Sequence, residues 1–230
     1  MSEVGKLYVI ATPIGHLGDI SFRALELLKS CDIVACEDTR MSYRLLSRYN
    51  ISRPLSIYNS AHEIRQSEIL LKKLKLGKNV ALISDAGTPT LSDPGFRLVR
   101  ACRQESIEVL PIPGANAAIA ALSVSGLPTM SFLFLGFLPP KSSTRRQIFQ
   151  QYRECPHTLI FYESCHRIEK FILEAREEWG DLRWICVARE MTKLHETYIT
   201  CTLGEMVTKE LYLPAKGECV ILIANQNFTL

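Results

Sequence analysis

Long apolar runs are missing from this sequence. No stretch reaches the roughly 18 residues that a membrane-spanning helix needs, and no signal peptide precedes the first apolar run at 7–12. Internal repeats and low-complexity tracts are also absent, which excludes a repeat architecture. The sequence therefore predicts a globular, cytoplasmic protein that is neither secreted nor embedded in a membrane.

Metal-binding cysteine pairs are missing as well. The eight cysteines include no pair with the two-residue separation of a zinc ribbon. Cys155, His157, Cys165 and His166 lie close together, but their spacing matches no standard zinc pattern. Because most cysteines lie inside apolar runs, we expect reduced thiols in the core and no bound metal.

Two common nucleotide-binding motifs are absent or incomplete. The sequence has no G-x-x-x-x-G-K-[ST], which excludes a P-loop, and Gly15 with Gly18 supplies only part of the G-x-G-x-x-G fingerprint. A large excess of one charge is also lacking, because 27 Lys and Arg stand against 24 Asp and Glu. The net charge of +3 by itself argues neither for nor against a polyanionic partner.

The first half of the sequence contains short apolar runs separated by segments of helical periodicity. Strands are expected at 7–12, 32–36, 55–58, 79–84 and 107–111, with the first helix beginning near Ser21. Strands that alternate with helices predict a parallel sheet and an α/β fold. With 47% hydrophobic residues, the chain can bury a sizeable core.

A domain boundary is expected where prolines and a glycine interrupt the pattern at 111–114, so we predict domains 1–113 and 114–230. Helices are expected at 115–125, 143–153 and 166–179, and strands at 132–135, 158–162, 184–188, 198–202 and 218–224. The last three strands have little helix between them, which predicts a mixed second sheet.

Two loops at strand ends, 11–19 and 84–95, are the best candidates for ligand binding, because ligands of open α/β sheets collect beyond the carboxyl ends of strands. Asp85 follows a buried strand and Gly87 permits close backbone approach, so we favour a ligand role for Asp85 over turn capping. For Asp93 we favour capping, because Asp93-Pro94 is typical of a helix start.

Six ordered motifs extend this pattern: ATPIGHLGDIS at 11–21, CEDTR at 36–40, SDAGTPTLSDPG at 84–95, PIPGANAAIAALSVSGLPT at 111–129, LIFYES at 159–164 and ARE-x-TKLHE at 188–196. With this combination, from residue 7 to about 224, the chain resembles the tetrapyrrole methylase superfamily, and within it the branch that methylates small-subunit ribosomal RNA. His16, Asn116 and Cys165 stand where that branch usually has Asn, Ser and Pro.

The resemblance implies a tetrapyrrole-methylase-like fold of two α/β domains, with a mainly parallel N-terminal sheet, a mixed C-terminal sheet and S-adenosylmethionine in the cleft between them. It further implies transfer of the methyl group to the 2′-hydroxyl of a cytidine ribose in small-subunit ribosomal RNA, by a homodimer. The cofactor-binding residues carried over from the motifs are Pro13, Asp85, Ala86, Gly87, Thr88, Asn116, Ala117, Tyr162 and Glu163.

Proton removal from the acceptor hydroxyl needs a base, or a cation that favours the alkoxide. The stretch 189–196 contains the densest group of side chains that could act as a base or a cation. Within it we expect Glu190 or Lys193, rather than His195, to be catalytic. The alternative is that these charges form ion pairs across the domain cleft or at a dimer contact. A second polar group, with Asp38 and Arg40, either caps the helix near Thr39 or lies near the acceptor.

Two basic clusters favour RNA as the partner. Arg40, Arg44 and Arg48 recur at every fourth residue, which on a helix places them on one face. The second cluster follows Pro139-Pro140, has no acidic residue within it and suits a mobile flap over a substrate. Its predicted RNA contacts are Lys141, Arg145 and Arg146. A solvated helix face is the ordinary alternative for both clusters.

Two other functions stay open at this point. A methyltransferase of the same superfamily that acts on a tetrapyrrole or another small substrate would keep the cofactor loops but would not need basic helix faces. A non-catalytic RNA-binding module is the second alternative, although the cofactor loops are all present.

Overall fold

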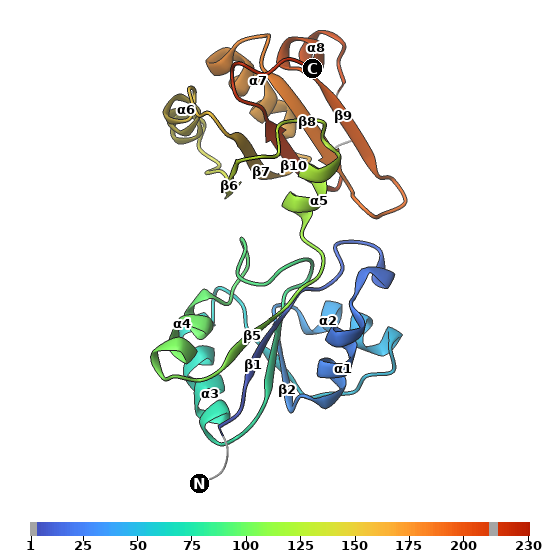
Figure 1. Cartoon of the computed structure of the whole chain (residues 1–230), viewed down its shortest axis with the longest axis vertical. Coiled ribbons are helices and arrows are strands. Elements are labelled where there is room, and N and C mark those ends of the chain that lie inside the picture. Colours follow the sequence, from blue (N-terminus) through green and yellow to red (C-terminus); the bar gives the residue numbers. More distant parts are fainter. Residues whose placement is uncertain (1–3, 212–215) are drawn as a thin grey trace. The chain divides into compact units, whose positions relative to one another are not determined.

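The computed structural model describes residues 4–211 and 216–230, and the chain divides into two compact units, Met1–Asn116 and Ala117–Leu230. The division falls three residues beyond the boundary expected from the sequence. Each unit contains its own five-stranded sheet with helices packed against it (Figure 1). Within the described residues, no helix is long and apolar enough to cross a membrane.

Unit 1 contains an all-parallel sheet in the order β3-β2-β4-β1-β5. Its strands are β1 (Leu7–Ile10), β2 (Ile33–Cys36), β3 (Leu55–Ile57), β4 (Val80–Ile83) and β5 (Val109–Ile112). Its helices are α1 (Phe22–Ser30), α2 (Thr39–Arg48), α3 (Glu63–Lys75) and α4 (Phe96–Gln104), with a short 3-10 turn at Leu17–Asp19. The predicted parallel sheet is confirmed.

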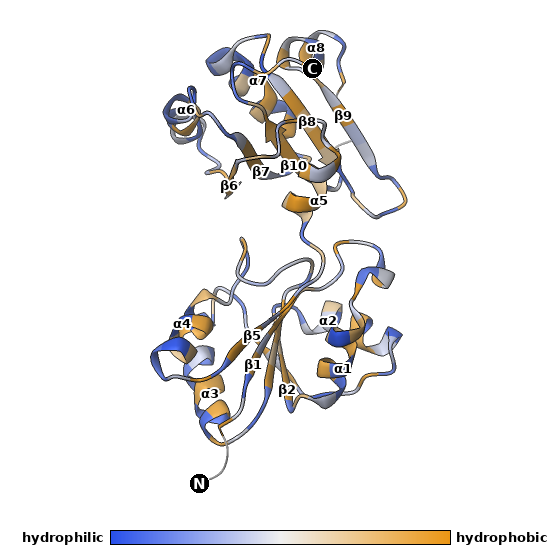
Figure 2. Ribbon diagram, viewed as in Figure 1, coloured by the Kyte–Doolittle hydropathy of each residue, from blue (hydrophilic) through white to orange (hydrophobic). Residues whose placement is uncertain are grey.

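Helices cover both faces of the unit 1 sheet, which explains why its strands are continuous apolar runs. Val34 and Cys36 pack with α1 and α2 on one face, whereas Ile33 and Ala35 pack with α3 and α4 on the other. Figure 1 shows the two helix pairs on opposite sides, and Figure 2 shows hydrophobic strands between helices whose outer faces are hydrophilic.

Unit 2 contains a mixed sheet in the order β6-β7-β10-β8-β9, in which β6 and β7 are parallel and the other neighbours are antiparallel. Its strands are β6 (Phe132–Phe137), β7 (Thr158–Ser164), β8 (Trp184–Arg189), β9 (Thr197–Thr202) and β10 (Glu218–Ile223). Its helices are α5 (Ala117–Val124), α6 (Ser142–Gln151), α7 (Ile168–Trp179) and α8 (Leu203–Thr208). The predicted mixed sheet is confirmed.

The core of unit 2 is built around aromatic rings. Phe149 of α6, Phe161 of β7 and Phe171 of α7 are fully buried, and Trp179 packs against Phe149 with 4.8 Å between ring centroids. The three phenylalanine rings contact one another edge to face, which contributes stability beyond the burial of their area. On the opposite face of the sheet, α5 contacts β7 and β10.

Two local features differ from the sequence prediction. Asp93 does not begin a helix: α4 has Gly95 as its N-cap, and Oε1 of Glu63 accepts hydrogen bonds from the backbone N–H groups of Gly95 and Arg97. Helix α8 was not predicted, although Thr202 and Glu205 form a complete capping box that marks its start.

All eight cysteines are free thiols, and seven of them are buried, as expected from their apolar surroundings. Cys165 and Cys219 lie with their sulfur atoms 3.1 Å apart, and burial is the main cause that raises the pKa of the Cys219 thiol. No group of three or more His, Cys, Asp or Glu side chains in the described part of the chain is arranged to hold a metal ion.

Candidate functional site

The loops that follow β1 and β4 are joined at the carboxyl edge of the unit 1 sheet. The backbone N–H of Thr12 donates to the Gly87 carbonyl at 2.9 Å, and the Gly87 N–H donates back to the Thr12 carbonyl at 3.0 Å. The buried Thr12 hydroxyl also donates to the Ser84 carbonyl at 3.0 Å. Two segments singled out from the sequence are therefore brought together by one isolated bridge.

Two glycines permit this close approach. Gly87 has φ +83°, a left-handed conformation that L side chains rarely adopt. A Cβ atom on Gly114, in the loop after β5, would lie 3.0 Å from the Cβ of Ala11. Neither Thr12 nor Gly114 was predicted as a site residue, although the Pro-Gly step at 113–114 signalled a tight turn.

The loop after β5 joins the same edge through Thr88. The Thr88 hydroxyl donates to the Ala115 carbonyl at 3.1 Å, and Nδ2 of Asn116 donates to Oγ1 of Thr88 at 3.3 Å. Thr88 and Asn116, both predicted to bind the cofactor, are therefore in direct contact. Loops after three adjacent strands thus meet at one edge.

Asp85 and Ala86 are exposed at this edge, whereas Pro13 and Gly87 are buried. Oδ1 of Asp85 accepts a hydrogen bond from the Asp38 N–H at 3.2 Å. The loss of solvation around Asp85, together with the nearby charge of Asp38, raises the pKa of the Asp85 carboxyl.

Glu37 lies close to the same carboxylates. Its pKa is raised by burial first, and then by the negative charges of Asp93, Asp85 and Asp38. The edge is therefore electronegative, which suits a ligand with an ammonium or sulfonium group and ribose hydroxyls. The exposed carboxylate, the permissive Gly87 backbone and the polar Thr88–Asn116 pair together fit a nucleoside of this kind.

Asp38 and Arg40 form the start of α2, in agreement with the capping alternative. Oδ1 of Asp38 accepts from the Arg40 N–H at 2.8 Å, and Oδ2 lies 2.7 Å from Nη2 of Arg40. These hydrogen bonds lower the pKa of the Asp38 carboxyl to about 2. The Arg40 side chain keeps 86% of its surface exposed, and Arg44 and Arg48 are exposed on the same helix.

The two cofactor candidates from LIFYES lie on β7 in unit 2. The half-buried ring of Tyr162 packs edge-to-face against Phe134 and Phe137. Glu163 is 2% exposed, accepts from the Ser164 N–H at 2.9 Å and forms an ion pair with Arg167 at 3.1 Å. Burial outweighs these two favourable contacts and raises the pKa of the Glu163 carboxyl.

The two catalytic candidates pair with each other inside unit 2. Nζ of Lys193 lies 3.0 Å from Oε1 of Glu190 and 2.9 Å from Oε2 of Glu218. The same Glu190 oxygen accepts from the Glu218 N–H at 3.0 Å. A Cβ on Gly217 would come within 2.7 Å of the Glu190 carboxyl, so this turn is tightly packed.

These contacts also fix the charges of the pair. Burial opposes ionisation of Glu190, but the hydrogen bonds from Glu218 and Lys193 outweigh it and lower the Glu190 pKa. Burial likewise acts against the charge of Lys193, and its two carboxylate partners outweigh it and raise the Lys193 pKa. The carboxylate is therefore a weak base, whereas the protonated amine keeps the charge that could favour an alkoxide. These ion pairs lie within unit 2, and the alternative of ion pairs across the domain cleft or at a dimer contact stays a prediction.

The structure corrects the prediction that the second basic cluster contacts RNA. Arg145, predicted to contact RNA, is 1% exposed, and its Nε donates to Oε2 of Glu174 at 2.7 Å. Arg146 pairs with Glu177 and Glu178. The acidic partners are supplied by α7, about 30 residues away in sequence, so a search within the cluster could not find them. Lys141 is exposed.

The predicted mobile flap at Pro139-Pro140 is also corrected. Nη2 of Arg167 donates to the Leu138 carbonyl at 2.8 Å, and Nη1 of Arg145 lies 3.4 Å from the carbonyl oxygens of both prolines. Both arginines are themselves held by carboxylates. This segment is therefore anchored to the body of unit 2.

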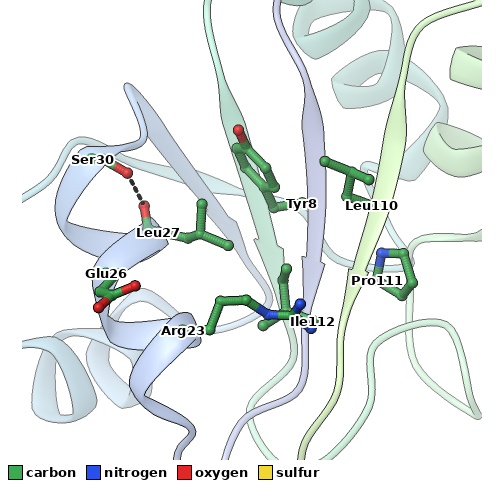
Figure 3. A pocket seen from close by; sticks show the side chains of 8 residues that line it. All are labelled: Tyr8, Arg23, Glu26, Leu27, Ser30, Leu110, Pro111 and Ile112. Atoms are coloured by element: carbon green, nitrogen blue, oxygen red, sulfur yellow. Dashed lines mark hydrogen bonds between the residues drawn. The ribbon is translucent and has the colours of Figure 1, made fainter.

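A cavity of about 310 Å³ lies elsewhere in unit 1, between α1 and strands β1 and β5 (Figure 3). None of the predicted site residues lines it. Its walls are formed by Tyr8, Arg23, Glu26, Leu27, Ser30, Leu110, Pro111 and Ile112.

Comparison with known proteins extends over nearly the whole chain. The family described as Tetrapyrrole (Corrin/Porphyrin) Methylases matches residues 6–207. A protein of Haemophilus influenzae named ribosomal RNA small subunit methyltransferase I is 48% identical over 95% of this chain and 78% of its own length. A protein of the same name from Pasteurella multocida is 49% identical over 95% of this chain and 79% of its length.

Solved structures agree on the fold. The methyltransferase CobJ has a TM-score of 0.72 at 17% identity, covering 96% of this chain and 94% of that one. Uroporphyrin-III C-methyl transferase from Thermus thermophilus, complexed with S-adenosyl homocysteine, has a TM-score of 0.66 at 17% identity, covering 96% and 97%. The chain therefore belongs to the tetrapyrrole methylase family, among the proteins named ribosomal RNA small subunit methyltransferase I.

Proposed function

We propose that this protein transfers the methyl group of S-adenosylmethionine to small-subunit ribosomal RNA, and that the acceptor is the 2′-hydroxyl of a cytidine ribose. The observation that carries the proposal is the edge of unit 1, where an exposed Asp85 and the Thr88–Asn116 pair meet in a family of methyltransferases. Relatives 45–49% identical are named ribosomal RNA small subunit methyltransferase I, which favours RNA over a tetrapyrrole acceptor.

S-adenosylmethionine supplies an activated methyl group on a sulfonium. The protein must then align the acceptor oxygen with that methyl group, and positioning of this kind accounts for a large share of catalysis in such reactions. In the proposal, Asp85 accepts hydrogen bonds from the cofactor, and Ala86, Gly87 and Thr88 line it through the backbone. Pro13, Asn116, Ala117, Tyr162 and Glu163 remain the other proposed cofactor residues.

For the RNA we propose the exposed face of α2. Between Thr39 and His62 the sequence has four arginines and no acidic residue. Arg44 and Arg48 make no ion pair within residues 4–211 and 216–230, so their charges are available to phosphates. Arg40 forms an ion pair with Asp38. Lys141 is a separate exposed cation in unit 2. Arg145 is not part of this proposal.

Because the proposed substrate is ribosomal RNA, we also propose that the protein acts in the cytoplasm. From the family resemblance we propose that it is a homodimer. Light scattering coupled to size-exclusion chromatography measures the second directly: a mass of twice the 26.0 kDa chain supports it, and a monomer contradicts it.

The proposed function is tested by methyl transfer in three parallel reactions. The protein is incubated with labelled S-adenosylmethionine and either naked ribosomal RNA, assembled small subunits or a tetrapyrrole precursor, and labelled nucleotides are mapped. Label on a cytidine ribose in either RNA reaction supports the proposal, and the stronger of the two identifies the substrate. Label only in the tetrapyrrole contradicts it, and cofactor binding without any transfer favours a non-catalytic RNA-binding module.

A further inference from the structure

Phe137 is a large exposed side chain at the carboxyl end of β6, with 59% of its surface accessible. A register shift between Phe134 and Gly136 precedes it, and irregularities of this kind redirect the side chains that follow. Phe137 lies opposite Tyr162 of β7, with edge-to-face rings and centroids 5.5 Å apart. The Tyr162 ring also packs edge-to-face against Phe134, with 4.9 Å between the ring centroids.

The backbone that follows Phe137 is fixed from two sides. Arg167 donates to the Leu138 carbonyl, and the buried Arg145 lies against the carbonyls of Pro139 and Pro140. Glu163 and Glu174 hold these two arginines in place. The exposed ring of Phe137 therefore lies on an anchored segment. Because this backbone is already ordered, a ligand that binds the ring loses less free energy to ordering the chain.

A positive charge lies close to Phe137 in the sequence, because Lys141 is four residues beyond it and directly precedes α6. Lys141 is the N-cap residue of this ten-residue helix and its own side chain makes no capping hydrogen bond, whereas the hydroxyl of Ser142 in the first turn donates to Oε1 of Glu174 at 2.7 Å. Lys141 is exposed and makes no ion pair within the described parts of the chain. An exposed lysine without an ion-pair partner is a common contact for a phosphate of a nucleic acid. An aromatic ring beside a phosphate-attracting group matches the chemistry of a nucleotide.

We propose that Phe137 stacks on an unpaired base of the RNA acceptor strand, while Lys141 contacts a neighbouring phosphate. Proteins that bind single-stranded RNA stack its bases on aromatic side chains and follow its backbone with positive charge. This inference rests on the proposed function and adds to it a contact in unit 2 that is separate from the α2 arginines.

Phe137→Leu and Phe137→Trp test the stacking contact in steady-state methylation of the RNA substrate. Loss of one base stack corresponds to about tenfold in affinity. We expect Phe137→Leu to raise KM for the RNA about tenfold with kcat unchanged, and Phe137→Trp to stay near the unaltered protein. Leu182→Ala, which removes another exposed apolar side chain of unit 2, is the matched control.

The affinity for S-adenosylmethionine, measured by calorimetry on the same variants, distinguishes the two sources of a nucleobase. An unchanged cofactor affinity supports an RNA base, whereas a parallel loss for Phe137→Leu would assign the ring to the adenine of the cofactor and overturn the inference. Lys141→Gln should reduce the salt dependence of RNA binding by about one phosphate contact, and Phe137→Leu should not.

Failure of this inference is distinguishable from failure of the proposed function. If the unaltered protein methylates RNA and Phe137→Leu has the same KM, only the stacking contact is wrong. If the unaltered protein transfers no methyl group to RNA, the proposed function itself is wrong.

Discussion

The backbone N–H of Asp38 donates a hydrogen bond to Oδ1 of Asp85 across 3.2 Å, and so ties the loop after β2 to the loop after β4. One oxygen of Asp85 is thereby oriented by the protein, and the exposed carboxylate can accept further hydrogen bonds from a ligand. The N-terminus of α2, with its arginines, follows directly from Asp38. The proposed cofactor residue and the proposed RNA-binding helix are therefore joined by a single hydrogen bond.

Asp85→Ala should weaken binding of S-adenosylmethionine by about ten- to a hundredfold, the usual range for losing hydrogen bonds to a charged group. Calorimetric titration measures this directly. Ser92→Ala, at an exposed position in the same loop, serves as the control and should bind normally. An Asp85→Ala protein that binds the cofactor as tightly as the unaltered chain would remove Asp85 from the site.

Cofactor binding should also depend on pH through Asp85. The carboxylate is the form that accepts hydrogen bonds, and reduced solvation raises its folded-state pKa above the ordinary 3.8. Affinity should therefore be full at neutral pH and decline as the pH falls through this raised value, earlier than for an ordinary aspartate. Titrations between pH 7 and pH 4 measure the decline. Asp85→Asn should flatten the profile, and an identical profile in this variant contradicts the assignment.

Arg44→Glu should impair RNA methylation and leave the affinity for S-adenosylmethionine intact. Nη1 of Arg44 lies 3.9 Å from the sulfur of Met41, and Arg44 makes no ion pair within the described residues, so reversing its charge breaks none there. The salt dependence of RNA binding should fall by about one to two phosphate contacts. Arg100→Glu on α4 is the matched reversal in unit 1 and should have little effect. Equal loss of cofactor affinity in Arg44→Glu would mean that α2 acts on the cofactor loops instead.

The sheets could be predicted from the sequence because burial on both faces produces continuous apolar runs. Val34 and Ile33 are both apolar because each faces its own helical layer. The errors arose where a distant residue supplies a partner. Glu63 caps α4 in place of Asp93, and Glu174 neutralises Arg145, a residue that has no acidic neighbour nearby in the sequence. Such contacts depend on how helices pack, which local patterns do not contain.

The pairing of Arg145 with Glu174 predicts a large difference in stability between two neighbouring arginines. Removing one partner of a buried ion pair leaves an uncompensated charge and costs about 3–5 kcal/mol, whereas exposed pairs contribute about 0–1 kcal/mol. Arg145→Met should therefore destabilise the protein far more than Arg146→Met, as measured by urea unfolding. The double variant Arg145→Met with Glu174→Met should recover much of the loss. Equal effects of the two single variants would contradict the buried pair.

Glu190 and Lys193 can be tested as catalytic or structural residues by separating rate from stability. Lys193 bridges Glu190 and Glu218, and the lowered pKa of Glu190 makes it a weak proton acceptor. If the pair is structural, Lys193→Met should leave kcat within about threefold, because the side chain then takes no part in the chemical step. The same variant should lower the thermal unfolding temperature only slightly, because exposed and half-exposed ion pairs contribute little more than about 1 kcal/mol to stability. Thermal unfolding and single-turnover rates measured on one preparation give both quantities. A kcat lowered more than a hundredfold, with stability and cofactor affinity unchanged, would instead make Lys193 part of the chemistry, and a shifted pH–rate profile in Glu190→Gln would identify the carboxylate as its partner.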